Sequence, residues 1–196
     1  GQVMVVLVTA QPVLPGAKNF VRALLAEAKT RQVPITTIVQ NYNPRKTSVV
    51  LGEEEKVLYG KGFILDTLCG KTYAISPRSF YQVNPIQTAV LYGLAVDAAH
   101  LTGKETVLDA YCGIGTIGLT ASGKAKLVVG VEVNRDAVQD AIGNAKHNGI
   151  RNARFFAADA TAWIREAADA GDRADVIFMD PPREGSTPEF LESVVR

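Results

Sequence analysis

Short apolar runs alternate with helical periodicity in the second part of the chain. The apolar runs predict buried strands at 106–110, 127–132, 153–157 and 174–179. Apolar residues recurring every three or four positions predict helices at 85–101, 115–122, 135–148, 161–170 and 188–195. This order predicts an α/β fold with a doubly wound parallel sheet, in which ligands lie beyond the carboxyl ends of the strands.

The first part of the chain has a different pattern, and it predicts a small α+β region at 1–75 ahead of a domain at 76–196. We expect a strand at 3–8, a helix at 20–30 capped by Asn19, and a strand at 35–40. Short antiparallel strands are predicted at 49–51, 56–58, 62–65 and 71–75. We interpret the acidic run at 53–55 as a solvated turn.

Composition narrows the class of protein only a little. The 196 residues are 47% hydrophobic with a formal net charge of +1, so this segment has no strong electrostatic signature of nucleic-acid binding. Two cysteines and no signal-peptide pattern favour a reducing, cytoplasmic location. No apolar run approaches the roughly 20 residues of a membrane helix. Both ends resemble cuts in a longer protein, since Gly1 stands in place of an initiating Met.

Glycines and acids gather where the predicted strands end. Gly113, Gly115 and Gly118 fit the pattern G-x-G-x-x-G after the first strand, and Glu132 ends the next strand about 20 residues on. Such a loop and acid fit either S-adenosylmethionine or NAD. Asp109 precedes the first glycine by four residues and would repel a pyrophosphate, which favours the methyl donor.

Asp159 and Asp180 follow the third and fourth strands, so four acids are predicted at one edge of the sheet. Any one of them could be a helix N-cap. Together they suit a cationic ligand with hydroxyl groups, and S-adenosylmethionine has a sulfonium, an amine and a ribose diol.

Four motifs together resemble the RNA 5-methyluridine methyltransferases, a class I family that acts on transfer RNA or on large-subunit ribosomal RNA. The resemblance covers about residues 76–196. The motifs are Ser79-Phe-Tyr-Gln-Val-Asn-Pro85, Asp109-Ala-Tyr-Cys-Gly113, Val131-Glu132 and Asp180-Pro-Pro-Arg-Glu-Gly185.

The resemblance implies a set of cofactor contacts. Gln82 lines the cofactor pocket and faces the target base, and Tyr111 lies beside the methionine moiety. Glu132 binds the ribose and Asp159 reaches the adenine. Asp109, Gly113 and Gly115 complete the site for S-adenosylmethionine and for its product, S-adenosylhomocysteine.

The resemblance also implies catalytic roles. Asp180, with Gln82, lies next to the transferring methyl and the flipped uracil. Arg183 contacts RNA phosphate or, as an alternative, forms an ion pair within its own loop. The family's nucleophilic cysteine adds to uracil C6 and a base removes the C5 proton, and we expect both groups beyond Arg196. This segment should therefore bind cofactor and lack activity by itself.

The remaining candidate side chains have structural interpretations. Cys112, in the glycine turn, is expected to be small and buried, and Cys69 to be structural or incidental. These two cysteines form no zinc site, and the segment lacks the four cysteines of the iron–sulfur clusters found in some family members. Trp163 lies at helical spacing from Ala160 and Ala167 and is expected in the core.

The predicted function is methyl transfer to C5 of uridine in RNA, with 23S rRNA favoured over tRNA. The alternatives are another class I nucleic-acid methyltransferase, an NAD-dependent oxidoreductase and a non-catalytic RNA-binding module. No membrane partner is expected. Without a further strand, 176–179 would be an exposed apolar edge, so we expect this edge to be covered by dimerisation or by the N-terminal part of the chain.

Overall fold

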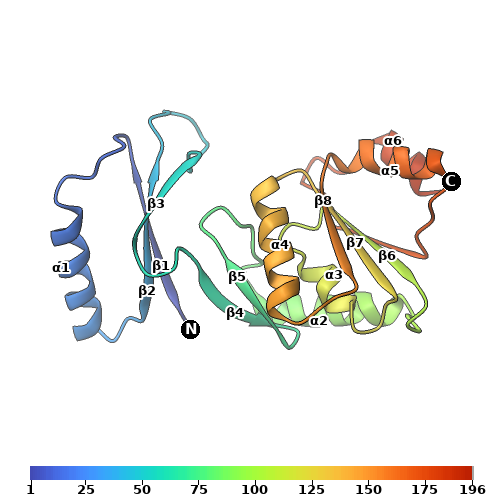
Figure 1. Cartoon of the computed structure of the whole chain (residues 1–196), viewed down its shortest axis with the longest axis horizontal. Helices are drawn as coiled ribbons and strands as arrows, with labels where there is room; N and C mark the ends of the chain where they lie inside the picture. The colour runs from blue at the N-terminus through green and yellow to red at the C-terminus, as the bar shows by residue number, and fades with distance from the viewer. Residues whose placement is uncertain (196) are drawn as a thin grey trace. The chain divides into compact units, whose positions relative to one another are not determined.

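The structure is a computed structural model that describes residues 1–195, and the chain in it divides into two compact units. The first unit comprises Gly1–Asp66 with Ala74–Arg78, and the second comprises Thr67–Tyr73 with the chain from Ser79 onward. Figure 1 gives the elements of each unit along the chain. The domain boundary at residue 75 that the sequence suggests stays a prediction.

A three-stranded sheet with the order β1-β2-β3 forms the first unit. β1 (Val3–Thr9) and β2 (Ile35–Tyr42) are parallel, and α1 (Ala17–Thr30) connects them. β3 (Glu54–Tyr59) pairs antiparallel with β2. The strands predicted at 3–8 and 35–40 are confirmed, and both continue further than their apolar runs indicated.

Several local predictions in this unit are wrong. The helix begins at Ala17, after Gly16 in a left-handed conformation, so Asn19 lies inside α1 and accepts a hydrogen bond from the Arg22 side chain. Residues 49–51 form no strand. Two of the three glutamates of the acidic run belong to β3, where the Glu55 carboxylate accepts a hydrogen bond from Asn41.

β4 (Ile64–Leu68) and β5 (Lys71–Ile75) pair in a separate two-stranded sheet. Cys69 and Gly70 make the turn between them, both with a positive φ. The strand at 71–75 lies at the predicted residues.

The second unit contains a four-stranded parallel sheet with the order β8-β7-β6-β9. The strands are β6 (Thr106–Ala110), β7 (Leu127–Glu132), β8 (Ala153–Ala157) and β9 (Val176–Met179). Three of the four have the predicted bounds, because strands buried on both faces read as continuous apolar runs. The α/β fold with a parallel, doubly wound sheet is confirmed.

Five helices alternate with these strands. They are α2 (Pro85–Ala98), α3 (Thr116–Ala121), α4 (Arg135–His147), α5 (Ala160–Ala170) and α6 (Pro188–Val194). α2, α3 and α4 lie on one face of the sheet, and α5 and α6 lie on the other (Figure 1). The Asn84 side chain accepts the Gln87 N–H and caps α2, as predicted. None of the helices within residues 1–195 has the length and apolar character needed to cross a membrane.

β9 lies at one edge of the sheet and pairs with β6 alone among the strands of residues 1–195. The expected cover of this edge, by dimerisation or by the N-terminal part of the chain, stays a prediction.

Candidate functional site

The four acids identified in the sequence lie along one edge of the parallel sheet. Ala110, which ends β6, pairs in register with Val131 and with Met179, and Glu132 pairs with Ala157. The carboxyl ends of the four strands are therefore level. Asp109, Glu132, Asp159 and Asp180 stand at or just beyond these ends, which is where doubly wound folds bind ligands.

The loop between β6 and α3 has an unusual backbone. Tyr111, Gly113 and Gly115 all have a positive φ, of 63°, 53° and 83°. Glycine adopts this region without penalty, whereas a tyrosine there stores strain of the order of 1–3 kcal/mol. Strain of this kind persists where the surroundings impose it, and here it falls on the residue directly after β6.

The backbone N–H groups of the three loop glycines already have acceptors within the chain. Gly113 donates to Glu132 Oε2 (3.1 Å), Gly115 to the Cys112 carbonyl (2.8 Å) and Gly118 to Asp109 Oδ2 (2.7 Å). A dinucleotide site uses such N–H groups to bind pyrophosphate. Two of the three acceptors here are carboxylates, so the loop presents negative charge to its ligand and fits a cation better than a diphosphate.

Asp109 is the most deeply buried acid of the site, with 1% of its surface exposed. Its Oδ2 accepts the Gly118 N–H, whereas its Oδ1 is buried and has no partner within residues 1–195. Burial raises the pKa of Asp109 to about 7, and the charges of Asp180 and Glu132 act in the same direction. A buried carboxylate oxygen without a donor fits a cationic amine such as that of S-adenosylmethionine.

Gly118 makes this arrangement possible through close packing. A Cβ atom at this position would lie 2.8 Å from Asp109 Oδ2 and 2.8 Å from Val128 Cγ1. Any larger residue would push the first turn of α3 away from β6. The third glycine of the pattern is thus required by its contact with the acid.

Glu132 is held by two backbone groups. Its Oε1 accepts the Asn134 N–H (2.8 Å), and its Oε2 accepts the Gly113 N–H. The side chain is half-buried, so its oxygens remain accessible to hydroxyl donors. This geometry fits a carboxylate that binds a ribose diol. The Tyr111 ring packs 5.6 Å from the Phe190 ring, which fixes one wall next to it.

The other predicted site residues are placed less tightly. The Asp159 carboxylate is exposed and caps α5 by accepting the Ala162 N–H (2.9 Å). Gln82 is half-buried. Asp180 itself is exposed directly after β9.

Arg183 lies in the tight turn from Pro182 to Gly185, where Gly185 N–H donates to the Pro182 carbonyl (2.8 Å). The side chain is exposed, and no carboxylate of residues 1–195 forms an ion pair with it. The structure therefore offers no support for the alternative of an ion pair within its own loop.

Cys112 does not have the surroundings of a nucleophile. Cys112 is buried, and burial together with the charges of Asp109 and Glu132 raises the pKa of its thiol. This confirms the prediction of a small buried side chain. No group of three or more His, Cys, Asp or Glu side chains that could hold a metal is found in the part of the chain the structure describes.

Sequence reasoning missed two buried tyrosines beside the glycine loop. The Tyr73 hydroxyl donates to the Thr116 carbonyl (3.3 Å), and the Tyr92 hydroxyl lies 3.1 Å from Thr116 Oγ1. It also missed that Ser79 Oγ donates to Asp140 Oδ2 (2.6 Å), which ties the start of the 79–85 motif to α4. The one feature of the sequence that could have indicated these contacts is a tyrosine hydroxyl in an otherwise apolar segment, as at Tyr92 in α2.

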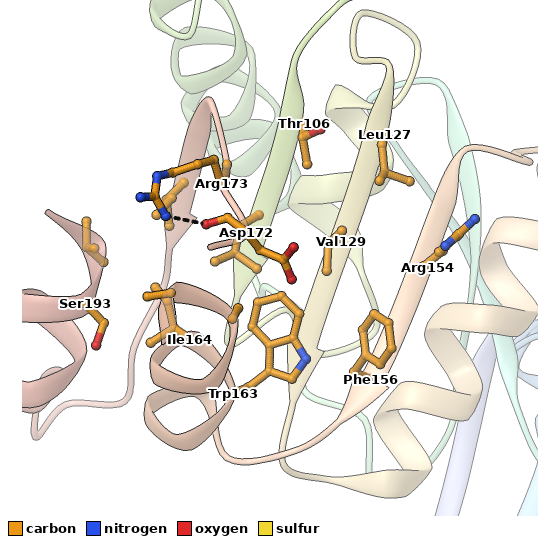
Figure 2. A pocket seen from close by; sticks show the side chains of 16 residues that line it. Thr106, Leu127, Val129, Arg154, Phe156, Trp163, Ile164, Asp172, Arg173 and Ser193 are labelled. Carbon is orange, nitrogen blue, oxygen red and sulfur yellow. Dashed lines mark hydrogen bonds between the residues drawn. The ribbon is translucent and has the colours of Figure 1, made fainter. Parts of the chain in front are cut away.

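A separate groove of about 430 Å³ lies on the α5 face of the sheet (Figure 2). Leu127, Val129 and Phe156 line it from the strands, and Trp163 from α5, with the Phe156 and Trp163 rings 5.8 Å apart. None of the predicted site residues lines this groove. Trp163 packs against the core cluster, as expected, while one side of it faces the groove.

Comparison with known proteins shows similarity to methyltransferases. A family model described as a methyltransferase domain matches residues 101–194. An uncharacterized RNA methyltransferase of Listeria monocytogenes is 50% identical over 195 residues, which is 100% of this chain and 42% of that protein. One from Halalkalibacterium halodurans is 45% identical over 196 residues, with the same coverage. The chain thus spans less than half the length of these relatives.

Solved structures give the same result. A tRNA (uracil-54, C5)-methyltransferase of Pyrococcus abyssi, in complex with S-adenosyl-L-homocysteine, superposes with a TM-score of 0.74 at 29% identity. The match covers 98% of this chain and 43% of that one. In sequence and fold, the chain is similar to the class I, S-adenosylmethionine-dependent RNA methyltransferases.

Proposed function

We propose that the full-length protein transfers a methyl group from S-adenosylmethionine to C5 of uridine in RNA, and that this chain holds the cofactor. The observation that carries the proposal is the buried Asp109 carboxylate, which has one oxygen without a donor beside a glycine loop whose N–H groups are occupied. A cation completes such a site, whereas a pyrophosphate would meet two carboxylates.

The proposed contacts follow the geometry of the edge. Asp109 Oδ1 faces the amine of the cofactor and Glu132 accepts the ribose hydroxyls, because its oxygens are already aimed by two backbone N–H groups. Tyr111 borders the methionine part, and Gly113 and Gly115 let it lie against the backbone. Asp159 reaches the adenine with the oxygen that does not cap α5.

Asp180 and Gln82 are proposed to border the target base, and Arg183 to contact RNA phosphate. The cofactor supplies the methyl group when bound. Addition to C6 of the uracil needs a thiolate, and the buried Cys112, whose pKa is raised, does not provide one. We therefore assign the nucleophile to a part of the full-length protein outside these residues.

Uridine C5 as the target is supported by the motifs at 79–85 and 180–185 and by the likeness to the archaeal tRNA enzyme. We propose 23S rRNA as the substrate. The archaeal neighbour acts on tRNA, which makes tRNA the second candidate.

The test combines binding and activity in the full-length protein. Calorimetry should give a micromolar dissociation constant for S-adenosylhomocysteine and no heat with NAD. Methylation of rRNA and tRNA lacking 5-methyluridine, followed by nucleoside mass spectrometry, should yield 5-methyluridine in one of the two RNAs. Binding of NAD alone, or methylation at a different base or atom, would overturn the proposal.

A further inference from the structure

The hydroxyl group of Tyr92 lies where separate segments of the cofactor site meet. Tyr92 is on α2 and is 4% exposed, with its Oη 3.1 Å from Thr116 Oγ1. Thr116 is the first residue of α3 and directly follows Gly115 of the glycine loop. A polar contact therefore joins α2 to the end of the glycine loop.

The surroundings of this hydroxyl are those of the site and not of an ordinary core. Burial raises the pKa of Tyr92, and the charges of Asp180 and Asp109 raise it further, against the opposing hydrogen bonds of Thr116 and Gln82. The hydroxyl consequently stays protonated, within the electrostatic reach of the acids that follow β9 and end β6.

A second tyrosine supports the same point of the loop. Tyr73 has no exposed surface, and its hydroxyl donates to the Thr116 carbonyl (3.3 Å). Thr120 Oγ1 donates to the same carbonyl (2.7 Å). The backbone of Thr116 is thus fixed independently of Tyr92. What Tyr92 adds is a contact to the Thr116 side chain.

Packing alone does not account for a tyrosine at this position. α2 carries apolar residues on every side, and a phenylalanine would fill the same space without a hydroxyl to desolvate. The buried hydroxyl is satisfied only because Thr116 and the 79–85 motif are arranged around it.

We propose that Tyr92 is a positioning residue that sets the affinity of the cofactor site by holding α2 and the glycine loop in register with each other. The inference rests on the proposed function. It predicts that the Tyr92 hydroxyl and the Thr116 hydroxyl act as one unit, so that removal of either has the same effect as removal of both.

The experiment uses Tyr92→Phe, Thr116→Val and the double variant in the full-length protein. Each should weaken S-adenosylhomocysteine binding about 3- to 10-fold by calorimetry, the expected loss for one buried hydrogen bond. The double variant should bind no more weakly than the weaker single variant. In steady-state assays the KM for S-adenosylmethionine should rise by the same factor, while kcat changes less than twofold.

Tyr59→Phe, at an exposed tyrosine of β3, is the matched control and should bind as the wild type does. Melting temperatures of the free proteins within about 3 °C of one another exclude a purely structural effect. If the wild type binds and Tyr92→Phe binds equally well, or if the two losses add, this inference fails. A wild type that does not bind S-adenosylhomocysteine would instead refute the proposed function.

Discussion

Both units bury polar side chains, but only in the second unit is a buried side-chain oxygen, Asp109 Oδ1, without a hydrogen-bond partner among the described residues. The first unit buries Thr37, Gln40, Asn41 and Asn43 along or just after β2. The second buries Asp109 at the end of β6. The difference between these regions separates a structural polar core from a binding site.

The polar groups of β2 hold loops in place. The Asn41 amide donates to the Gly52 carbonyl and to Glu55, and its oxygen accepts the Gly52 N–H. The Gln40 amide donates to Thr9 Oγ1 and to the carbonyls of Gln11 and Pro12, in the loop after β1. Every one of these contacts lies within the unit, so nothing in it calls for a ligand.

Asp109 is held by the same kind of contact on one oxygen only. Its other oxygen is buried without a donor within the described residues, and its pKa is raised by burial. Burial of a carboxylate in this state costs stability, and a protein retains such a group where a ligand completes it. The comparison therefore predicts that substitutions in the first unit change stability and those at the edge change binding and activity.

The largest expected effect is on catalysis. Asp180→Ala in the full-length protein should reduce methyl transfer at least about 1,000-fold, because we propose that this acid borders the reacting groups. Rates are measured with radiolabelled S-adenosylmethionine and substrate RNA. Glu166→Ala, which removes an exposed acid of α5, is the control and should keep the wild-type rate. A fully active Asp180→Ala protein would remove this residue from the site.

The next effect is on stability and belongs to the first unit. Asn41→Ala should lower the free energy of unfolding by about 2–3 kcal/mol, because the partly buried N–H and carbonyl of Gly52 lose their hydrogen bonds to the Asn41 side chain. Denaturant titration measures the loss, and affinity for S-adenosylhomocysteine should not change. Asn19→Ala, at an exposed asparagine of α1, should cost less than about 0.5 kcal/mol. Equal stability of the two variants would mean that the β2 contacts are dispensable.

The pH dependence of stability tests the state of Asp109. Its pKa is near 3.8 in the unfolded chain and about 7 in the folded one, so the folded state binds the proton more tightly. Stability from this group is therefore lost as pH rises from about 4 to about 7, at up to about 1.4 kcal/mol for each pH unit. Asp109→Asn keeps the acceptor for Gly118 and should lack this loss.

Urea unfolding of both proteins at pH 5 and pH 8 measures the difference. We expect the stability advantage of Asp109→Asn to be larger at pH 8 than at pH 5. The variant should also bind S-adenosylhomocysteine more weakly at pH 8, since it no longer offers a carboxylate to the amine. A pH-independent difference would show that Asp109 is ionised in the folded protein throughout this range.

The smallest effect distinguishes a cap from a ligand contact at Asp159. Asparagine also caps helices, so Asp159→Asn should leave the melting temperature within about 2 °C of the wild type. The lost second carboxylate oxygen should weaken S-adenosylhomocysteine binding about threefold by calorimetry. Unchanged affinity would show that Asp159 only caps α5. Its role would then be structural, like that of Asn41.

The sequence predicted the second unit better than the first, for physical reasons. Leu127–Glu132 is buried on both faces and reads as an unbroken apolar run, which leaves little choice of element. β3 begins with Glu54 and Glu55, and an acidic run is more typical of a solvated turn than of a strand. Its pairing with β2 depends on contacts from Asn41 that no local pattern encodes. The start of α1 was missed because Gly16 replaces the side-chain cap that Asn19 suggested.

The candidate site divides in the same way. Its acids and glycines were predictable, because parallel strands bring their carboxyl ends together whatever the loops do. Tyr73 and Tyr92 were not, since a tyrosine in an apolar helix or strand reads as core until its hydroxyl finds a partner. The contact of Gly118 with Asp109 is likewise a product of packing between α3 and β6.

The most direct test of the account is a crystal structure of the full-length protein with S-adenosylhomocysteine. We predict its amine beside Asp109 Oδ1, its ribose hydroxyls on Glu132, and its sulfur near Tyr111 and Asp180. Density for the ligand anywhere else, including the apolar groove beside Trp163, would contradict the claim that the acids at the carboxyl edge form the cofactor site.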